Sequence, residues 1–320
     1  MKRIIALLLS LVLMLSLAAC GGEKTPNTNE EQKPTQSQNT TDEEKPGESE
    51  PEESEPEATT PTEDETDKNE ISFTELVVVD NEKCLIKITG IDNDLIWGYS
   101  LKVYMENKSA DQSYMFSVDE ASTNGVQRTA LLATEVAAGK KANESLIFMD
   151  DMSEKDIGDY TDIELKFSVS DSEDWLSDPV AEETVHVYPY GEDKAVQFVR
   201  EAQDSDKVVV DNEYVTAIVT GYEEDEIWGY TVKMFLVNKT DKNLMFSSSE
   251  SSVNGFMIDS FLAETVSPGK CAFSSMIWDD TTLEENSITK IEEIEFNLQV
   301  YDFENLSADY LANETVTLNP

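Results

Sequence analysis

From residue 71 onward, apolar and polar side chains alternate with a period of two. The clearest stretches are 99–106 and 162–169, and the pattern returns at 230–236 and 294–300. Successive side chains of a β-strand point to opposite faces, so this pattern predicts half-buried strands. Further strands are expected at 83–89, 114–118, 146–149 and 183–188.

The same stretch of sequence occurs twice. Residues 77–82 (VVVDNE) return as VVVDNE at 208–213, and Ile96-Trp97-Gly98-Tyr99 returns as Ile227-Trp228-Gly229-Tyr230, an offset of 131 positions. Solenoid repeats have periods of roughly 20–50 residues, so a period this long indicates a duplicated domain. We place the two units at 71–189 and 207–320.

About seven short strands with one apolar face in each unit predict an all-β protein, with two tandem Ig-like antiparallel β-sandwich domains. The Cys–Trp–Cys core of antibody domains is absent. Between the units, residues 190–206 are expected to form a short helical linker, because Ala195, Val196 and Val199 would lie on one side of a helix.

Several short motifs carry a family resemblance. Asn107-Lys108, Ser122-Thr123-Asn124-Gly125 and Ala138-Gly139-Lys140-Lys141, with Val253-Asn254-Gly255-Phe256 in the second unit, resemble poorly characterised Ig-like domains of Gram-positive lipoproteins. These domains look related in plan to the immunoprotective extracellular antigen family of mycobacteria. The resemblance implies an Ig-like sandwich at the cell surface, and it brings no catalytic residues with it.

The first residues predict export and lipidation. Lys2 and Arg3 precede an apolar run, 4–17, that is shorter than the roughly 20 residues a membrane-spanning helix needs. A basic start, a short apolar run and small residues are typical of a signal peptide, here 1–19. Leu17-Ala18-Ala19-Cys20 resembles the lipobox of bacterial lipoproteins, so Cys20 is the expected lipidation site, and two acyl chains anchor a protein stably.

Residues 20–70 are expected to be a disordered tether. Regularly spaced prolines punctuate Glu, Thr, Ser, Asn and Gln, and Ala58 is the only apolar side chain after Gly22. Such a composition cannot bury enough surface to offset its ordering entropy. The tether would carry the folded part away from the membrane, into or through a cell wall.

Charge narrows the choice of partners. The chain has 67 acidic and 23 basic residues, a formal net charge of −44. Lys and Arg are the residues that neutralise phosphates, so no nucleic acid is expected as a partner. Anionic lipid head groups are disfavoured too, and any charged ligand should be cationic.

No catalytic constellation is present. The single histidine, His186, is expected to face outward on a strand, and Cys84 falls on the apolar side of its strand as a core residue. No serine elbow, zinc motif or phosphate-binding glycine loop occurs. We therefore expect no enzymatic activity and no cofactor.

Calcium is the one metal considered. Asp92 and Asp94 in the first unit and Asp225 and Glu226 in the second occupy equivalent acidic turns, and calcium takes several oxygen ligands from such loops. No EF-hand spacing is present, and acidic turns also arise on any highly acidic surface. The alternative is a solvated turn.

The repeated aromatic motif is a candidate binding patch. Trp97, Tyr99, Trp228 and Tyr230 flank glycines near a loop, where aromatic rings can contact sugars or a protein partner. The alternative is that these rings pack over the end of each sandwich.

These observations predict a non-enzymatic lipoprotein on the outer face of the membrane, on a Gram-positive surface. Its two similar domains would bind an unknown envelope protein or glycan, or support assembly, through multivalent weak contacts. The alternative is a structural spacer or accessory subunit of an envelope complex without a soluble ligand.

Overall fold

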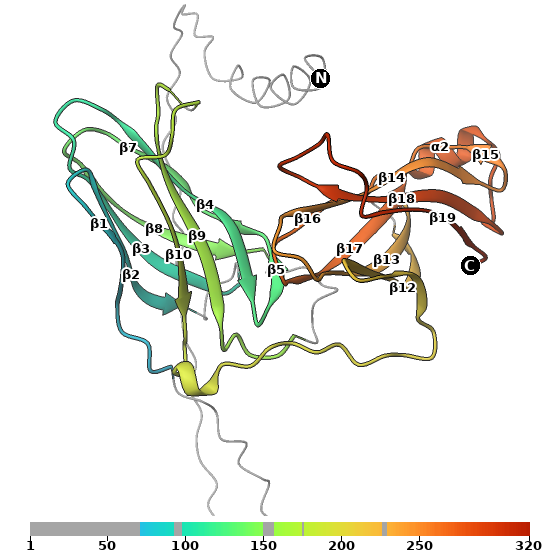
Figure 1. Ribbon diagram of the computed structural model, residues 1–320, viewed down its shortest axis with the longest axis horizontal. Coiled ribbons are helices and arrows are strands. Elements are labelled where there is room, and N and C mark those ends of the chain that lie inside the picture. Colours follow the sequence, from blue (N-terminus) through green and yellow to red (C-terminus); the bar gives the residue numbers. More distant parts are fainter. Residues whose placement is uncertain (1–70, 93–97, 150–156, 175, 226–228) are drawn as a thin grey trace, which may run out of the picture. The chain divides into compact units, whose positions relative to one another are not determined.

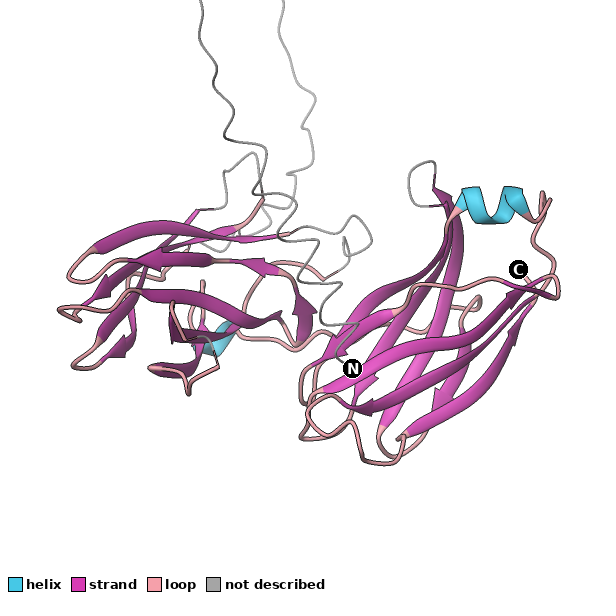
Figure 2. Cartoon of the chain, turned by 90° about the horizontal axis from the view of Figure 1, so that it is seen from above, coloured by secondary structure: helices cyan, strands magenta, loops and turns pink. Residues whose placement is uncertain are grey.

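The computed structural model describes residues 71–92, 98–149, 157–174, 176–225 and 229–320. All of them belong to one compact unit, Glu65–Pro320. Strands dominate this part of the chain, and the helical segments are short (Figures 1 and 2). The protein is therefore all-β, as the two-residue periodicity predicts. The signal peptide, Cys20 and the tether lie outside the described residues.

The first half of the chain, residues 71–189, forms two antiparallel layers around one hydrophobic core. One layer has the order β1-β2-β3-β8-β6. Its strands are β1 (Leu76–Asp80), β2 (Cys84–Asp92), β3 (Ser100–Asn107), β8 (Lys141–Phe148) and β6 (Ala130–Leu131). The other contains β10 (Ala181–Val187), β9 (Ile163–Asp171), β4 (Tyr114–Thr123), β5 (Val126–Arg128) and β7 (Ala133–Val136). Ile86 and Val103 of the first layer pack with Phe116 and Phe167 of the second.

The second half, residues 207–320, repeats this plan. One layer is formed by β11 (Lys207–Asp211), β12 (Val215–Asp225), β13 (Gly229–Asn238) and β17 (Cys271–Trp278). Strand β17 pairs in parallel with β5, so this layer and the β10-β9-β4-β5 layer of the first half are one continuous sheet. The other layer of the second half consists of β14 (Leu244–Val253), β15 (Phe256–Met257), β16 (Ala263–Val266), β18 (Ile294–Asp302) and β19 (Ala312–Leu318). A separate core, with Trp278 fully buried, lies between them. The short helix α2 (Asp280–Glu285) follows β17, and Asp279 caps it by accepting a hydrogen bond from Thr282 N.

The two halves share irregularities as well as strand order. The pairing of the first two strands shifts register between Val77 and Val79, and again between Val208 and Val210. A second shift, at Gly90, recurs at Gly221. Bulges insert an extra residue and bend a strand, so their recurrence means that the duplicated sequence folds into a duplicated strand pattern. The domain boundaries stay a prediction, because the described chain forms one compact unit.

The predicted helical linker is wrong. Helical structure in 190–206 is limited to the 3-10 turn η2 (Glu192–Lys194). The following backbone is hydrogen-bonded to the first half instead: Val196 N donates to Thr161 Oγ1 (3.1 Å) and Phe198 N to Asn124 O (2.7 Å). Tertiary partners of this kind override a weak helical propensity.

The two cysteines of the described chain are unpaired. Cys84 is fully buried, which confirms its predicted place in the first core, and burial raises its pKa. Cys271 is half-buried at the start of β17, and burial raises its pKa to about 11.

Candidate interaction site

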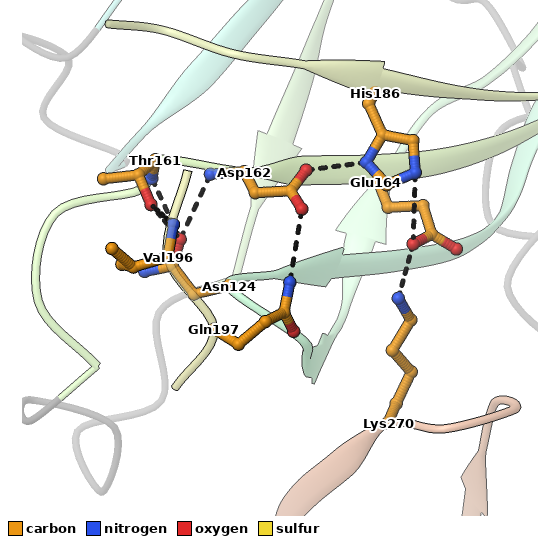
Figure 3. Close-up of polar contacts among 8 residues, drawn as sticks. All are labelled: Asn124, Thr161, Asp162, Glu164, His186, Val196, Gln197 and Lys270. Atoms are coloured by element: carbon orange, nitrogen blue, oxygen red, sulfur yellow. Dashed lines mark hydrogen bonds and ion pairs between the residues drawn. The ribbon is translucent and has the colours of Figure 1, made fainter. Parts of the chain in front are cut away.

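His186 lies in a cluster of charged side chains on the β9–β10 edge (Figure 3). His186 lies on β10, directly opposite Glu164 of β9 in the antiparallel pair. His186 Nδ1 is 2.7 Å from Asp162 Oδ1, and Nε2 is 3.6 Å from Glu164 Oε2. Tyr188 stacks on the imidazole, with the ring planes 13° apart. The histidine therefore faces outward, as predicted, and it is held between two carboxylates.

The two carboxylates also contact other segments (Figure 3). Asp162 Oδ2 accepts a hydrogen bond from Gln197 Nε2 in the linker (3.4 Å). Glu164 accepts one from Lys270 Nζ of the second half, whose side chain is only 16% exposed. The cluster thus connects the first half, the linker and the start of β17.

Asn124 supports the cluster from the turn between β4 and β5. Its φ of 53° lies in the left-handed region, which asparagine tolerates better than most residues. Asn124 Oδ1 accepts hydrogen bonds from Thr161 N (3.0 Å) and Asp162 N (3.1 Å), and its Nδ2 donates to Asp159 O (2.8 Å). These bonds fix the segment that leads into β9.

The geometry favours an ionic joint over a catalytic dyad. A histidine that acts as a base needs a free ring nitrogen facing a hydroxyl, thiol or water. Here Nε2 of His186 lies 3.6 Å from Glu164 Oε2, and within the described residues no hydrogen bond joins the ring to a serine, threonine or cysteine. The cluster is suited to holding segments together.

A cleft of about 790 Å³ is lined by residues of both halves. The carboxylates of Asp119, Glu120 and Glu264 outnumber the one guanidinium, that of Arg128, and Met149, Phe261 and Phe273 supply the apolar lining. Such a combination suits a ligand or side chain that is cationic and partly apolar.

Glu264 makes the stability of this region depend on pH. Burial raises the pKa of its carboxyl, and a hydrogen bond from Ser274 Oγ (3.2 Å) offsets part of the rise. A raised carboxyl pKa contributes stability below the unfolded value, and that contribution is lost as pH rises through the folded value. We expect Glu264→Gln to have a higher Tm than the wild type at pH 7, with the difference closing towards pH 4.

Thermal melts monitored by circular dichroism between pH 4 and 7 measure this difference. Glu314→Gln, an exposed carboxylate on β19, is the matched control and should follow the wild type. Parallel pH profiles for Glu264→Gln and the wild type would contradict the assignment.

Three of the exposed large apolar side chains of the second half lie close together in the sequence. Phe256 is 49% exposed, Met257 71% and Phe261 69%, and we call them the β15 patch. In the first half, the positions equivalent to Phe256 and Met257 hold Val126, which is fully buried, and the polar Gln127. The two halves therefore differ at the positions of Phe256 and Met257, whereas Phe261 has an exposed apolar counterpart in Leu131.

The predicted aromatic patch is only partly described. Trp97 and Trp228 lie outside the described residues. Tyr99 is half-buried, with its ring 4.8 Å from that of Tyr160, and burial raises its pKa. Tyr230 is 8% exposed, and burial raises its pKa to about 12. Both tyrosines pack against the body of their half, so neither presents an open ring face.

The calcium candidates are described incompletely. Asp94 and Glu226 lie outside the described residues, as does the side chain of Asp225. Asp92 is 3.5 Å from Lys102 Nζ. Within the described part of the chain, no group of three or more His, Cys, Asp or Glu side chains could hold a metal ion. Calcium binding stays a prediction.

Sequence reasoning missed the charged cluster and the β15 patch. The residues that meet in the cluster are far apart along the chain, and the sequence carries no signal of their meeting. The patch did leave a signal: aligning the two repeats places Phe256-Met257 opposite Val126-Gln127. An apolar replacement on a hairpin of a repeated unit indicates a changed environment.

Comparisons with known proteins give no family. No protein-family model and no curated protein sequence matches the chain. Among solved structures, the YadV chaperone is similar at 12% identity over 69% of this chain and 92% of its own, with a TM-score of 0.21. A protein of unknown function from Porphyromonas gingivalis matches at 11% identity over 69% and 91%, with a TM-score of 0.20. Red sea bream transglutaminase matches at 9% identity over 77% and 31%, with a TM-score of 0.21.

No helix in the described ranges has the length and apolar character needed to cross a membrane.

Proposed function

We propose that this protein is a non-enzymatic lipoprotein, anchored to the outer face of the membrane through Cys20, whose duplicated β-sandwich halves serve binding or assembly at the cell envelope. The lipobox sequence Leu17-Ala18-Ala19-Cys20 supports the anchor, and the composition of residues 20–70 supports a long tether. The Gram-positive resemblance supports a surface location.

The β15 patch is the observation that favours a binding function over a purely structural one. Large apolar side chains that are exposed together mark interaction sites, because leaving them in water is unfavourable, and Phe256 and Met257 are neighbours on β15. Phe256, Met257 and Phe261 lie within six positions of one another and are each about half exposed or more. A spacer has no need for such a surface.

The net charge of −44 defines the class of partner further. Phosphate-rich partners would be repelled. A protein or glycan that offers apolar contact, with neutral or cationic groups around it, fits both the β15 patch and the acidic surface.

Affinity capture from the organism's envelope tests this proposal. The bait is residues 21–320, made without lipid, and the matched bait carries Phe256→Ser, Met257→Ser and Phe261→Ser. We expect one envelope component to be retained by the wild-type bait and reduced at least about tenfold with the variant. Equal recovery with both baits would place the binding site outside the β15 patch, and no recovery with either bait would favour the spacer.

A further inference from the structure

Among the described residues, the two halves meet at an interface between β5 and β17, and this interface has two different sides. The hairpin side belongs to the first half: β5 pairs with β17 at Val126 and Cys271, and Cys271 N donates to Gly125 O (3.1 Å). Gln127 Oε1 accepts from Ser267 N (3.2 Å).

Two carboxylates complete the hairpin side. Glu120 Oε2 accepts a hydrogen bond from Ser267 Oγ (2.6 Å), and Glu164 accepts one from Lys270 Nζ. The edge side, in the second half, therefore consists of the turn and strand start at Ser267, Lys270 and Cys271. Two carboxylates of the hairpin side thus meet one hydroxyl and one ammonium group of the strand edge, and Glu120 is also 3.5 Å from Lys166 Nζ of its own half.

Because the two halves are repeats, the chain has a second hairpin side and a second edge side. The second half has its own hairpin side, in which Gly255, Phe256, Glu250 and Glu295 replace Gly125, Val126, Glu120 and Glu164. The first half has its own edge side, in which Ala137, Lys140 and Lys141 replace Ser267, Lys270 and Cys271.

The hairpin side of the second half and the edge side of the first half are both exposed among the described residues. Phe256 and Met257 are exposed, and so are Glu295 and Lys140, for which the described residues provide no ion pair. Strand β8 is paired along its length only with β3, because β6 reaches it only at Ile147 and Phe148. The edge of β8 from Lys141 to Leu146 is thus accessible to another strand.

We propose that the open hairpin side of one chain binds the open edge side of a second copy of the same chain. This inference rests on the proposed function in assembly and names its partner. Glu295 of one copy pairs with Lys140 of the next, the carbonyl of Gly255 faces the start of β8, and Phe256 and Met257 are covered.

The contact is head-to-tail, because the two binding surfaces are different patches. Each added copy presents a new open hairpin, so the product is a row of copies, or a ring where the rotation between copies closes. Inside one chain the linker connects the hairpin side to the edge side, which gives them a high effective concentration. Separate chains have no such linker. Association in dilute solution is therefore weak, and membrane anchoring strengthens it by confining the copies.

Sedimentation velocity of residues 21–320 without lipid, over a range of concentrations, tests the proposal. We expect the wild type to associate reversibly. Lys140→Glu alone places like charges opposite each other, as does Glu295→Lys alone. Each variant should associate at least about tenfold more weakly than the wild type.

Mixing the two variants is the decisive step. In the mixture, Glu295 of one variant meets the native Lys140 of the other, and the introduced lysine meets the introduced glutamate, so every contact again joins opposite charges. We expect the mixture to regain wild-type association. Lys194→Glu in η2 is the matched control and should leave association unchanged, and circular dichroism shows whether each variant is folded.

A wild type that remains monomeric at every accessible concentration would overturn the proposal, as would folded variants whose mixture does not associate. Neither result affects the capture of a different envelope component through the β15 patch. Failure of self-association and failure of the proposed function are therefore distinguishable.

Discussion

Replacing Gly229 with alanine is expected to lower the free energy of unfolding by about 3–5 kcal/mol. Gly229 has a φ of 88°, a conformation that L side chains rarely adopt. A Cβ at this position would stand 2.3 Å from the carbonyl oxygen of Trp278 and 2.9 Å from Asp280 N. These are backbone atoms, so the connection between β17 and α2 would have to move. Urea unfolding monitored by circular dichroism measures the loss.

Gly221 offers a matched control in the neighbouring strand. A Cβ at Gly221 would meet no heavy atom within 4 Å, so Gly221→Ala should change stability by less than about 1 kcal/mol. Equal stability for Gly229→Ala and the wild type would contradict the steric argument. Gly98, in the first copy of the Trp-Gly-Tyr motif, has a φ of 96°. The repeated glycine is thus explained by backbone conformation, without any binding role.

Replacing Asn238 with alanine is expected to cost about 2–4 kcal/mol. The side chain is 1% exposed. Its Nδ2 donates to Lys242 O (2.7 Å) and Val266 O (2.8 Å), and its Oδ1 accepts from Thr240 N (2.9 Å). Alanine would leave buried backbone groups without partners. Chemical denaturation measures the change in unfolding free energy.

The first half provides an independent check on this prediction. Asn107 makes the equivalent bonds, to Gln112 O (2.8 Å), Val136 O (2.8 Å) and from Ser109 N (2.9 Å), so Asn107→Ala should cost a similar amount. Asn313→Ala, an exposed position on β19, is the control and should be nearly neutral. Neutral behaviour of both buried variants would mean that other groups replace the lost bonds.

The strands could be predicted from the sequence because a half-buried strand has apolar residues on its buried face and polar residues on its exposed face, so the two kinds alternate. The alternation at 99–106 predicts β3 almost to its ends, and 162–169 predicts β9. The same alternation in the second repeat, at 230–236 and 294–300, predicts β13 and β18. Strand ends were less predictable, because β4 continues past the predicted residue 118 through a bulge to Thr123.

The linker and the charged cluster could not be predicted, because tertiary contacts decide both. Residues 192–203 have a helical pattern, but Val196 N and Phe198 N find acceptors on the first half. Arg200 then binds Asp206 through both terminal nitrogens at 2.7 Å. His186 gains its partners only when β10 pairs with β9. Alternation along one strand says nothing about neighbours across a sheet.

Each half of the described chain carries one unpaired thiol, and both are protected by burial. Because thiolate is the reactive form and burial raises both pKa values, oxidation and alkylation of the folded chain should be slow. Cys84 becomes accessible only when the first core opens, and Cys271 when the start of β17 separates from β5. The two native thiols can therefore serve as built-in probes, whose labelling kinetics report the opening of each region without any engineered change.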